Sequence, residues 1–325
     1  MDLKSLSSYS EMVDREISRY LDREVDELYE PLRDLFARGG KRIRPFLCMV
    51  SCEAVGGKKE DALKAAAAIE MVHNFTLIHD DIADRSELRR GQPCLHHKYG
   101  LGVAINAADG LFSTAYEVLG DTLADGDGRV FKTLSGGITE VCEGQAMDIS
   151  WVQNRRWDLS EEDYFEMIRR KTGALMSASC ETGAIIGGGT ERQIRALSDF
   201  GMDMGVGFQI HDDVLNLRGD VKRYGKEICG DINEGKRTLV VIYTLSVCTP
   251  KEKKRLIKIL DRERNSQEEI NNALGIINRY GSVDRATDIA KNLVEKGKKG
   301  LKALPDSRAR ETLRDAADYM IERKL

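Results

Sequence analysis

Proline is scarce in this chain, and its scarcity limits what the chain can fold into. Only five prolines occur in 325 residues, and the segment from Glu60 to Arg90 contains neither proline nor glycine. Proline interrupts helices because it lacks a backbone N–H, so long stretches without it, with apolar residues three and four positions apart, indicate α-helix. A glycine pair precedes the segment, and Gly91 with Pro93 ends it, as is typical of helix boundaries. We therefore expect an all-α fold, with one helix continuing to Gly91.

The rest of the chain supports the same interpretation. The run VVIYTLSV from Val240 could form a strand, but one short β-branched run among helices is more often a buried helical segment. From Lys251 onward the chain is highly charged, and we expect solvent-facing helices packed on the core. No linker, low-complexity segment or clear repeat divides the sequence. We predict one all-α domain spanning residues 1–325.

Charge and cysteine content argue against several classes of protein. The net charge is only −4, so no basic excess points to nucleic acid as a partner. Seven cysteines are dispersed without a Cys-x-x-Cys pair, which favours reduced thiols over a disulfide frame or a zinc site. The N-terminus is polar and unlike a signal peptide, and no window approaches the roughly 18 apolar residues of a membrane helix. We expect a cytoplasmic protein with no transmembrane segment.

Two aspartate-rich segments, far apart in the chain, share one internal spacing. In TLIHDDIADRSELRRGQP, Asp80 and Asp84 share one face of a helix, while Asp81 is turned about 100° away. In FQIHDDVLNLRGD, Asp212 and Asn216 have the same relation. Solvated carboxylates at a helix end are the ordinary interpretation. However, the runs FTLI and VGFQI before the clusters favour burial, and buried unpaired carboxylates are costly unless cations neutralise them.

The oxygen ligands in these clusters indicate which metal ion they would bind. Carboxylate oxygens without cysteine or a clear histidine set favour Mg²⁺, which commonly binds one or two carboxylates together with substrate phosphate. Two carboxylate walls facing each other would hold a polyphosphate through bridging metal ions, since carboxylates alone would repel it. The candidate magnesium ligands are Asp80, Asp81, Asp84 and Asp212.

Basic residues in other segments supply the cations that such a site needs. RGGKRIRP places Lys41 and Arg44 three positions apart after a glycine pair, a reasonable cradle for phosphate. Each of these cations alone is more often a surface charge. Together with two acidic clusters, they indicate two anion sites, one bridged by metal and one bound by lysine and arginine. The other candidates are Arg89 and Arg90 in RRG, Lys171 with Thr172 in RRKTGAL, and Lys226 and Lys236 in GKEICGDINEGKRT.

With these motifs in place, the sequence resembles a known family, the head-to-tail (trans) isoprenyl diphosphate synthases. The matching pieces, in order, are GGKRIRP, LIHDDIADRSELRRGQP, KTGAL, GFQIHDDVLNL and GKEICGDINEGKRTL. Each piece is moderately specific, and their order and spacing together are highly specific. The resemblance covers roughly residues 35 to 245. It implies an isoprenoid synthase fold, with antiparallel helices around a deep central cavity, in a homodimer with three magnesium ions per active site.

The resemblance also implies a role for each candidate residue. Asp80 and Asp84 would ligate two of the metal ions and Asp212 the third. Lys171 and Lys226 would act with these aspartates in catalysis. The residues implied for the diphosphate of the allylic substrate are Arg89, Lys171, Thr172, Gln209, Lys226 and Lys236. Those implied for the diphosphate of isopentenyl diphosphate are Lys41, Arg44, His73 and Arg90.

The implied reaction is a magnesium-dependent condensation. The allylic C–O bond ionises, the double bond of isopentenyl diphosphate attacks the cation, and loss of a proton leaves a product five carbons longer. Metal ions and lysines would stabilise charge on the departing diphosphate, and an apolar cavity would exclude water. Asn216 departs from many relatives, which carry aspartate there. It keeps an oxygen ligand but loses a charge, and we do not expect it to bind metal directly.

The residues just before the first cluster bear on product length. In this family the growing chain runs beside that helix, and bulky residues form the floor of its tunnel. Phe75 is fifth before Asp80, and Thr76 lies next to it. A helical wheel alone favours Thr76, whereas an aromatic at position 75 resembles the archaeal type of geranylgeranyl diphosphate synthase. We expect geranylgeranyl diphosphate, made from dimethylallyl, geranyl and farnesyl diphosphates, while ordinary core packing of Phe75 is the alternative.

Other functions predict partly different sequences. A synthase that stops at farnesyl diphosphate, or continues to geranylfarnesyl diphosphate, would carry the same motifs. A class I terpene cyclase has no need of Lys41, Arg44 and Arg90, so these residues argue against it. A non-catalytic subunit of a heteromeric synthase typically loses its aspartate motifs, and this chain keeps both.

Overall fold

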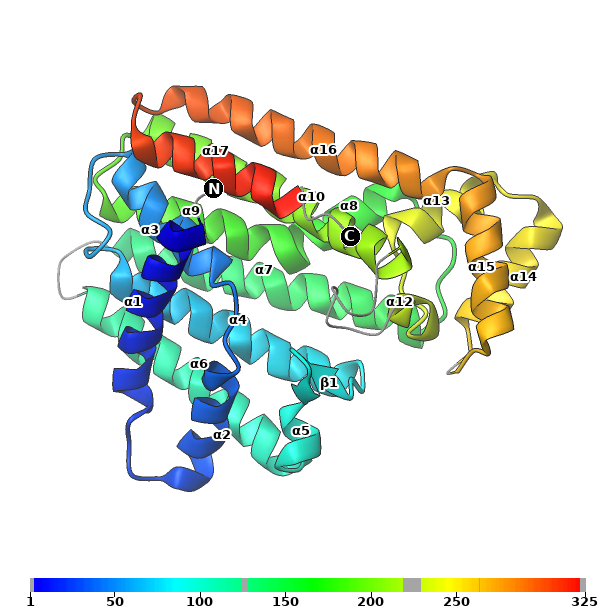
Figure 1. The fold of residues 1–325 in the computed structure, drawn as a ribbon, viewed down its shortest axis with the longest axis horizontal. Helices are drawn as coiled ribbons and strands as arrows, with labels where there is room; N and C mark the ends of the chain where they lie inside the picture. Colours follow the sequence, from blue (N-terminus) through cyan, green and yellow to red (C-terminus); the bar gives the residue numbers. More distant parts are fainter. Residues whose placement is uncertain (1–2, 124–127, 219–228, 263, 322–325) are drawn as a thin grey trace.

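The computed structural model describes residues 3–123, 128–218, 229–262 and 264–321, and these fold almost entirely into helices (Figure 1). The predicted all-α fold is confirmed. The earlier elements are α1 (Leu3–Leu21), α2 (Asp26–Ala37), α3 (Ile43–Ala54), α4 (Leu63–Ala83), the short strands β1 (Leu88–Arg89) and β2 (Gln92–Pro93), α5 (Leu95–Lys98), α6 (Leu101–Leu123) and α7 (Gly128–Gln153). The later elements are α8 (Glu161–Ile168), the π-helical turn η1 (Arg169–Gly173), α9 (Ala174–Ile186), α10 (Glu191–Arg218), α12 (Gly230–Asn233), α13 (Leu239–Val247), α14 (Pro250–Leu260), α15 (Gln267–Arg279), α16 (Ser282–Gly300), the 3₁₀ turn η2 (Leu301–Ala303) and α17 (Arg308–Ile321).

Long helices pack side by side, and two of them carry the aspartate motifs. α10 packs against α9 and α16, α4 packs against α6, and both α3 and α7 pack against α9. The first motif is at the C-terminal end of α4, and the second lies in the last turns of α10. Figure 1 shows these two helix ends pointing toward the same end of the molecule, where β1 and α12 lie. The fold therefore brings the two motifs to a common region.

Two clusters of buried apolar side chains stabilise this arrangement. The larger cluster draws mainly on α1, α3, α4, α6, α7, α9, α10 and α17, and the smaller one on α8, α10 and α13 to α16. The run from Val240 lies in α13, where Val240, Val241 and Ile242 are buried in the smaller cluster, so its helical prediction is confirmed. Within the described residues, no helix combines the length and apolar character needed to cross a membrane.

One prediction about helix length is wrong. The helix predicted to continue to Gly91 is α4, which ends at Ala83 with Asp84 as its C-cap residue. Arg85 adopts a left-handed backbone conformation with φ 53°, and the N–H of Ser86 donates to the carbonyl oxygen of Asp81 at 2.9 Å. Arginine seldom adopts this conformation, so the absence of glycine and proline concealed the helix end. The chain after the motif is therefore free to form the β1–β2 hairpin.

Candidate active site

The first aspartate motif keeps its helical spacing to its last member. The N–H of Asp84 donates to the carbonyl oxygen of Asp80 at 2.8 Å, so the two residues lie one turn apart at the end of α4. Asp81 lies on another face, is 5% exposed, and accepts a hydrogen bond from Nε of Arg89 at 2.9 Å. Asp80 and Asp84 are therefore placed to act together, while Arg89 engages the carboxylate of Asp81.

A tight hairpin directs the two arginines that follow the motif. β1 and β2 pair antiparallel, and the two residues between them, Arg90 and Gly91, have positive φ values of 54° and 73°. Two successive residues of this kind form the turn that best matches the twist of a hairpin. Arg89 turns back to Asp81, whereas Nη1 of Arg90 donates to the carbonyl oxygen of Gly39. The hairpin thus places one arginine beside the first motif and the other beside the GGKRIRP segment.

Asp80 has no counter-ion in contact with it among the residues that the structure describes. Its carboxylate forms no hydrogen bond or ion pair with any of them. Burial raises the pKa of Asp80, Lys171 opposes that rise, and the neighbouring Asp84 adds to it. A carboxylate in this setting is stabilised in its charged form by a nearby cation.

Lys171 lies on a π-helical turn close to the first motif. The turn η1 joins α8 to α9, and single π-turns are frequent at functional sites. Nζ of Lys171 lies 2.5 Å from Oδ2 of Asp148 on α7. Burial opposes the charge on Lys171, but Asp148 and Asp80 outweigh it and raise the pKa. Gly144 permits the close approach of α7, because a Cβ there would lie 2.3 Å from the backbone nitrogen of Lys171.

Lys236 reaches the first motif from the segment that follows α12. Its Nζ lies 3.3 Å from Oδ2 of Asp84, 2.5 Å from Oε2 of Glu234 and 3.8 Å from Oδ1 of Asp231. Burial opposes this charge as well, but Asp231 and then Asp84 raise the pKa of Lys236 well above its ordinary value. Both lysines therefore stay charged and lie within electrostatic reach of the first motif.

The second motif connects to the turn η1 through a chain of hydrogen bonds. The buried Asp213 accepts from the hydroxyl of Tyr164 and from Nε2 of Gln209, each at 2.8 Å. Oε1 of Gln209 accepts in turn from the hydroxyl of Thr172 at 3.3 Å. Thr172 and Gln209, both predicted to bind the allylic diphosphate, are thus in contact, although they lie on different elements.

The side chain of Asn216 has a structural role that its position in the motif does not indicate. Its side chain is buried, and Oδ1 accepts a hydrogen bond from the backbone N–H of Asp231 at 3.2 Å. The amide therefore holds the start of α12, which carries one of the carboxylates around Lys236. The second motif is in this way tied to the same lysine that contacts Asp84.

His73 lies among arginines of the predicted isopentenyl diphosphate site. Nη1 of Arg44 lies 3.1 Å from Nε2 of His73, and because a guanidinium can only donate, Nε2 accepts and the imidazole is neutral. Burial, followed by Arg44 and Arg90, lowers the pKa of His73 well below its ordinary value. Burial also lowers the pKa of Arg44, while Glu70 and Asp212 act in the opposite direction. The structure therefore brings Arg44, His73 and Arg90 together, within electrostatic reach of Asp212.

Two further predicted residues are Lys41 and Lys226. Nζ of Lys41 lies 5.3 Å from the ring centroid of Tyr319 on α17, a cation–π contact with the C-terminal helix. Lys226 falls within residues 219–228, outside the described part of the chain.

Phe75 belongs to a stack of aromatic rings from three helices. Its ring centroid lies 4.7 Å from that of Phe112 on α6, and the two rings are stacked. Phe112 contacts Tyr116 at 4.9 Å, and Tyr116 contacts Phe131 on α7 at 5.7 Å. Thr76 instead donates its hydroxyl to the carbonyl oxygen of His73, one turn earlier in α4, at 2.8 Å.

Several residues that organise the site were missed by sequence reasoning. Arg42 is buried in the GGKRIRP segment and donates to Glu70 at 2.9 Å and to Asp14 at 2.8 Å. Its position in a basic motif was visible, but its partners lie on other helices and carry no local signal. The other missed residues are Asp148, Tyr164, Asp231 and Glu234, which engage predicted site residues from separate elements.

The donor groups fit a divalent cation that also binds a phosphorylated substrate. In the described residues, no three histidine, cysteine, aspartate or glutamate side chains lie close enough to hold a metal ion by themselves. Mg²⁺ commonly keeps several waters and takes only one or two carboxylates, with substrate phosphates completing its shell. Asp80 and Asp84 are hard oxygen donors of this kind, and Asp80 has no cation in contact with it among the described residues.

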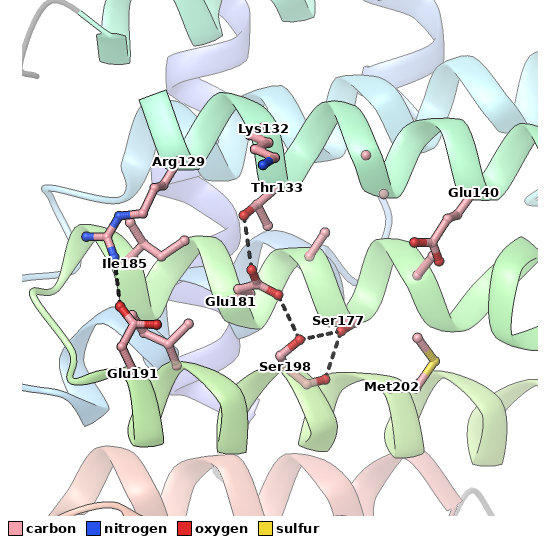
Figure 2. Close-up of a pocket in the computed structure, with 15 residues that line it drawn as sticks. Arg129, Lys132, Thr133, Glu140, Ser177, Glu181, Ile185, Glu191, Ser198 and Met202 are labelled. Atoms are coloured by element: carbon pink, nitrogen blue, oxygen red, sulfur yellow. Dashed lines mark hydrogen bonds and ion pairs between the residues drawn. The ribbon is translucent and has the colours of Figure 1, made fainter. Parts of the chain in front are cut away.

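A pocket of about 520 Å³ lies elsewhere, between α7, α9 and α10 (Figure 2). Glu181 of α9 spans it, accepting hydrogen bonds from Thr133 of α7 at 3.1 Å and from Ser198 of α10 at 2.8 Å. The residues that line this pocket include none of the predicted site residues. The converging charges around the aspartate motifs, rather than this hollow, identify the candidate active site.

Comparison with known sequences yields a consistent group of relatives. A family model described as Polyprenyl synthetase matches residues 25–277. A short chain isoprenyl diphosphate synthase of Methanothermobacter thermautotrophicus is 41% identical over 98% of each chain. A geranylgeranyl diphosphate synthase of Sulfolobus acidocaldarius is 42% identical over 86% of this chain and 84% of the relative. A geranylfarnesyl diphosphate synthase of Natronomonas pharaonis is 35% identical over 98% of this chain and 97% of the relative.

Solved structures share the fold over nearly the whole chain. A geranylgeranyl pyrophosphate synthetase of Pyrococcus horikoshii matches with a TM-score of 0.91 and 38% identity, over 99% of this chain and 98% of that one. A geranylgeranyl pyrophosphate synthase of Corynebacterium glutamicum, complexed with isoprenyl diphosphate and magnesium, matches with a TM-score of 0.87 and 30% identity, over 98% and 99%. The helical architecture described above is therefore that of isoprenoid synthases.

Proposed function

The chain belongs to the polyprenyl synthetase family and is a short-chain trans-prenyl diphosphate synthase, and we propose that its product is geranylgeranyl diphosphate. In this proposal, isopentenyl diphosphate is condensed head-to-tail with dimethylallyl, geranyl and farnesyl diphosphates in turn. Relatives described as geranylgeranyl and as geranylfarnesyl diphosphate synthases both align with most of this chain. Product length must therefore depend on individual residues and not on the family as a whole.

The stacking of Phe75 is the observation that carries the proposed length. A single phenylalanine on a helix could rotate aside to admit a longer chain. The ring of Phe75 is packed against Phe112, which is itself packed against Tyr116 and, through it, Phe131. A longer product would have to displace several rings from α6 and α7. This arrangement supports Phe75 as the tunnel floor that stops growth at twenty carbons.

Residues around the first motif would bind and orient the allylic diphosphate. We propose that Asp80, Asp84 and Asp212 hold the metal ions, as the magnesium and isoprenyl diphosphate of the Corynebacterium synthase support. Bound Mg²⁺ would supply positive charge that helps the diphosphate to depart. Lys171 and Lys236 already lie beside these aspartates and would stabilise the same developing charge. Asp81 is the weaker candidate for metal, because Arg89 engages it.

The arginine group around His73 would bind isopentenyl diphosphate. Because neutral His73 accepts from one N–H of Arg44, it orients that guanidinium while leaving its other donors for phosphate oxygens. Arg90 and Lys41 would complete this second diphosphate site. The double bond of isopentenyl diphosphate then attacks the allylic cation, and the departing diphosphate takes the proton that is lost.

Product analysis tests the proposal directly. The purified chain is incubated with Mg²⁺, isopentenyl diphosphate and one primer at a time, and the products are separated by chromatography and identified by mass spectrometry. We expect dimethylallyl, geranyl and farnesyl diphosphates all to be extended to twenty carbons. A product that stops at fifteen carbons, or accumulates at twenty-five, would contradict the proposed length. Condensation that occurs only after a partner protein is added would instead indicate a non-catalytic subunit.

We also propose that the chain forms the homodimer that its family resemblance implies. Three large apolar side chains near the start of α6 are exposed, Leu101 at 54%, Val103 at 37% and Ile105 at 40%. A second copy covering them would remove this apolar surface from water. Light scattering during size-exclusion chromatography should give twice the mass of one chain, and a single-chain mass would contradict the dimer.

A further inference from the structure

Arg237 is a buried cation directly beside Lys236. Its side chain is only 2% exposed, and its guanidinium carbon lies 3.8 Å from the ring centroid of Trp157. Nε donates to the carbonyl oxygen of Arg156 at 3.1 Å, and Nη1 donates to the carbonyl oxygen of Gly235. One side chain therefore joins the segment before α8 to the segment that carries Lys236.

An ordinary ion pair does not explain this burial. Among the described residues, the carboxylate oxygen paired with this guanidinium is Oδ1 of Asp261, 3.9 Å from Nη2, and it accepts a hydrogen bond from Nε1 of Trp157 at 3.0 Å. Nη2 has no hydrogen-bond partner in the described residues. Burial lowers the pKa of Arg237 to about 10, against the opposing effects of Asp261 and Asp148. Apolar residues often replace buried ionic groups without loss of stability, so a guanidinium here points to a role beyond stability.

The surrounding contacts restrain the backbone on both sides of Lys236. Nη1 of Arg237 donates to the carbonyl oxygen of Gly235, the residue before Lys236. The N–H of Lys236 donates to the carbonyl oxygen of Asp231 at 2.9 Å. On the other side, the side chain of Thr238 caps the first turn of α13. Fixing the backbone in advance removes its share of the freedom that is lost on binding, so binding has to order only the side chain of Lys236. From this backbone position the ammonium of Lys236 reaches Asp84.

We propose that Arg237 is a positioning residue. This proposal rests on the proposed function of Lys236 as a diphosphate ligand. Stacked on Trp157, it holds the backbone so that the ammonium of Lys236 meets Asp84 and the allylic diphosphate. Arg237 itself touches no substrate. Its effect is to preorganise a charge that is needed when the C–O bond breaks, and preorganised charges stabilise a transition state more than mobile ones do.

A double-mutant cycle tests this role, with kcat and KM measured for each substrate separately. Arg237→Met should lower kcat/KM for the allylic diphosphate by about tenfold and leave KM for isopentenyl diphosphate within about twofold. Lys236→Met should lower kcat/KM for the allylic diphosphate further. Because Arg237 acts through Lys236, the double variant should match Lys236→Met within about twofold. Effects that multiply in the double variant would overturn the proposal.

Arg285 provides a matched control. It also lies over an aromatic ring, 4.6 Å from the centroid of Tyr243, and pairs with Glu161, but it makes no contact with the Lys236 segment. Arg285→Met should therefore leave both kinetic constants within about twofold of the unmodified enzyme. If Arg237→Met does not fold, Trp157→Leu removes the stacking surface from the opposite side and enters the same cycle. A Lys236→Met variant with full activity would contradict the function proposed for Lys236, whereas multiplicative effects would contradict only that of Arg237.

Discussion

The ammonium nitrogen of Lys236 lies 3.3 Å from Oδ2 of Asp84, although 152 residues separate the two in the chain. This contact joins the end of α4 to the segment after α12, and Asn216 of the second motif holds the start of α12. Asp84 is thus met by a lysine from elsewhere in the fold, and Lys171 lies within electrostatic reach of Asp80. In the proposed function, a diphosphate with its metal ions would bind between these aspartates and lysines and replace the contact of Lys236 with Asp84.

Asp80 and Asn216 should differ sharply in their effect on turnover. Asp80→Ala removes a proposed metal ligand and should lower kcat by at least about a thousandfold. Asn216→Ala removes only the bond to Asp231 and should lower kcat by about tenfold, through displacement of the Lys236 segment. Steady-state assays at saturating substrates and Mg²⁺ would measure kcat for both variants, with circular dichroism to confirm folding. Equal collapse of the two variants would mean that Asn216 itself binds metal.

Replacing aromatic residues of the Phe75 stack by alanine should lengthen the product. Phe75→Ala should shift products beyond twenty carbons, and Phe112→Ala should do the same to a smaller extent, because Phe112 supports the ring of Phe75. Mass spectrometry of products formed from farnesyl diphosphate gives the distribution. Tyr243→Ala on α13 removes a ring outside this stack and should leave product length unchanged. Twenty-carbon products from Phe75→Ala would remove Phe75 as the floor.

The buried Asp213 should make stability depend on pH. Burial and the charge of Asp231 raise the pKa of Asp213 from 3.8 to about 7, against the hydrogen bonds from Gln209 and Tyr164. Between pH 4 and 7 the folded state then retains a proton that the unfolded state has lost, so stability falls as pH rises, by up to about 1.4 kcal/mol per pH unit. Asp213→Asn cannot ionise and should lack this decline. Urea unfolding without divalent metal at pH 4.5 and 7.5 tests it, and parallel profiles of the two proteins would contradict it.

Removing only one member of the buried pair Arg42 and Glu70 should strongly destabilise the fold. Their side chains are 0% and 2% exposed, so Arg42→Met leaves a buried carboxylate without its partner and should destabilise the fold by about 3–5 kcal/mol. Adding Glu70→Gln removes that charge and should recover part of the loss. The exposed pair of Arg129 and Glu191 is the control, where Arg129→Met should cost less than about 1 kcal/mol. Urea unfolding measures all three variants, and equal losses at the two sites would contradict the expectation.

The boundary of α4 shows where local patterns fail. A segment without glycine or proline predicted a helix to Gly91, yet the helix ends at Ala83 because Arg85 adopts a left-handed conformation. The resulting hairpin directs Arg89 and Arg90 to different neighbours. No periodicity in the sequence indicates that reversal, because its stability comes from hydrogen bonds formed after the chain has folded back.

The amino-acid sequence was sufficient to predict the helical fold, the spacing of Asp80 and Asp84 on one face, and the family. The first two properties are local, since helix propensity and a period of 3.6 residues act over a few turns, and the family follows from the order of the motifs along the chain. The pairing of each cation with its carboxylate depends on the tertiary structure, which joins Lys171 to Asp148, Lys236 to Asp84, and Arg42 to Glu70. Each pair joins residues that are distant in the chain. Packing of whole helices brings the paired residues together, and burial sets the strength of the interaction between their charges. Neither the pairing nor this interaction strength can be predicted from the spacing of residues within one motif.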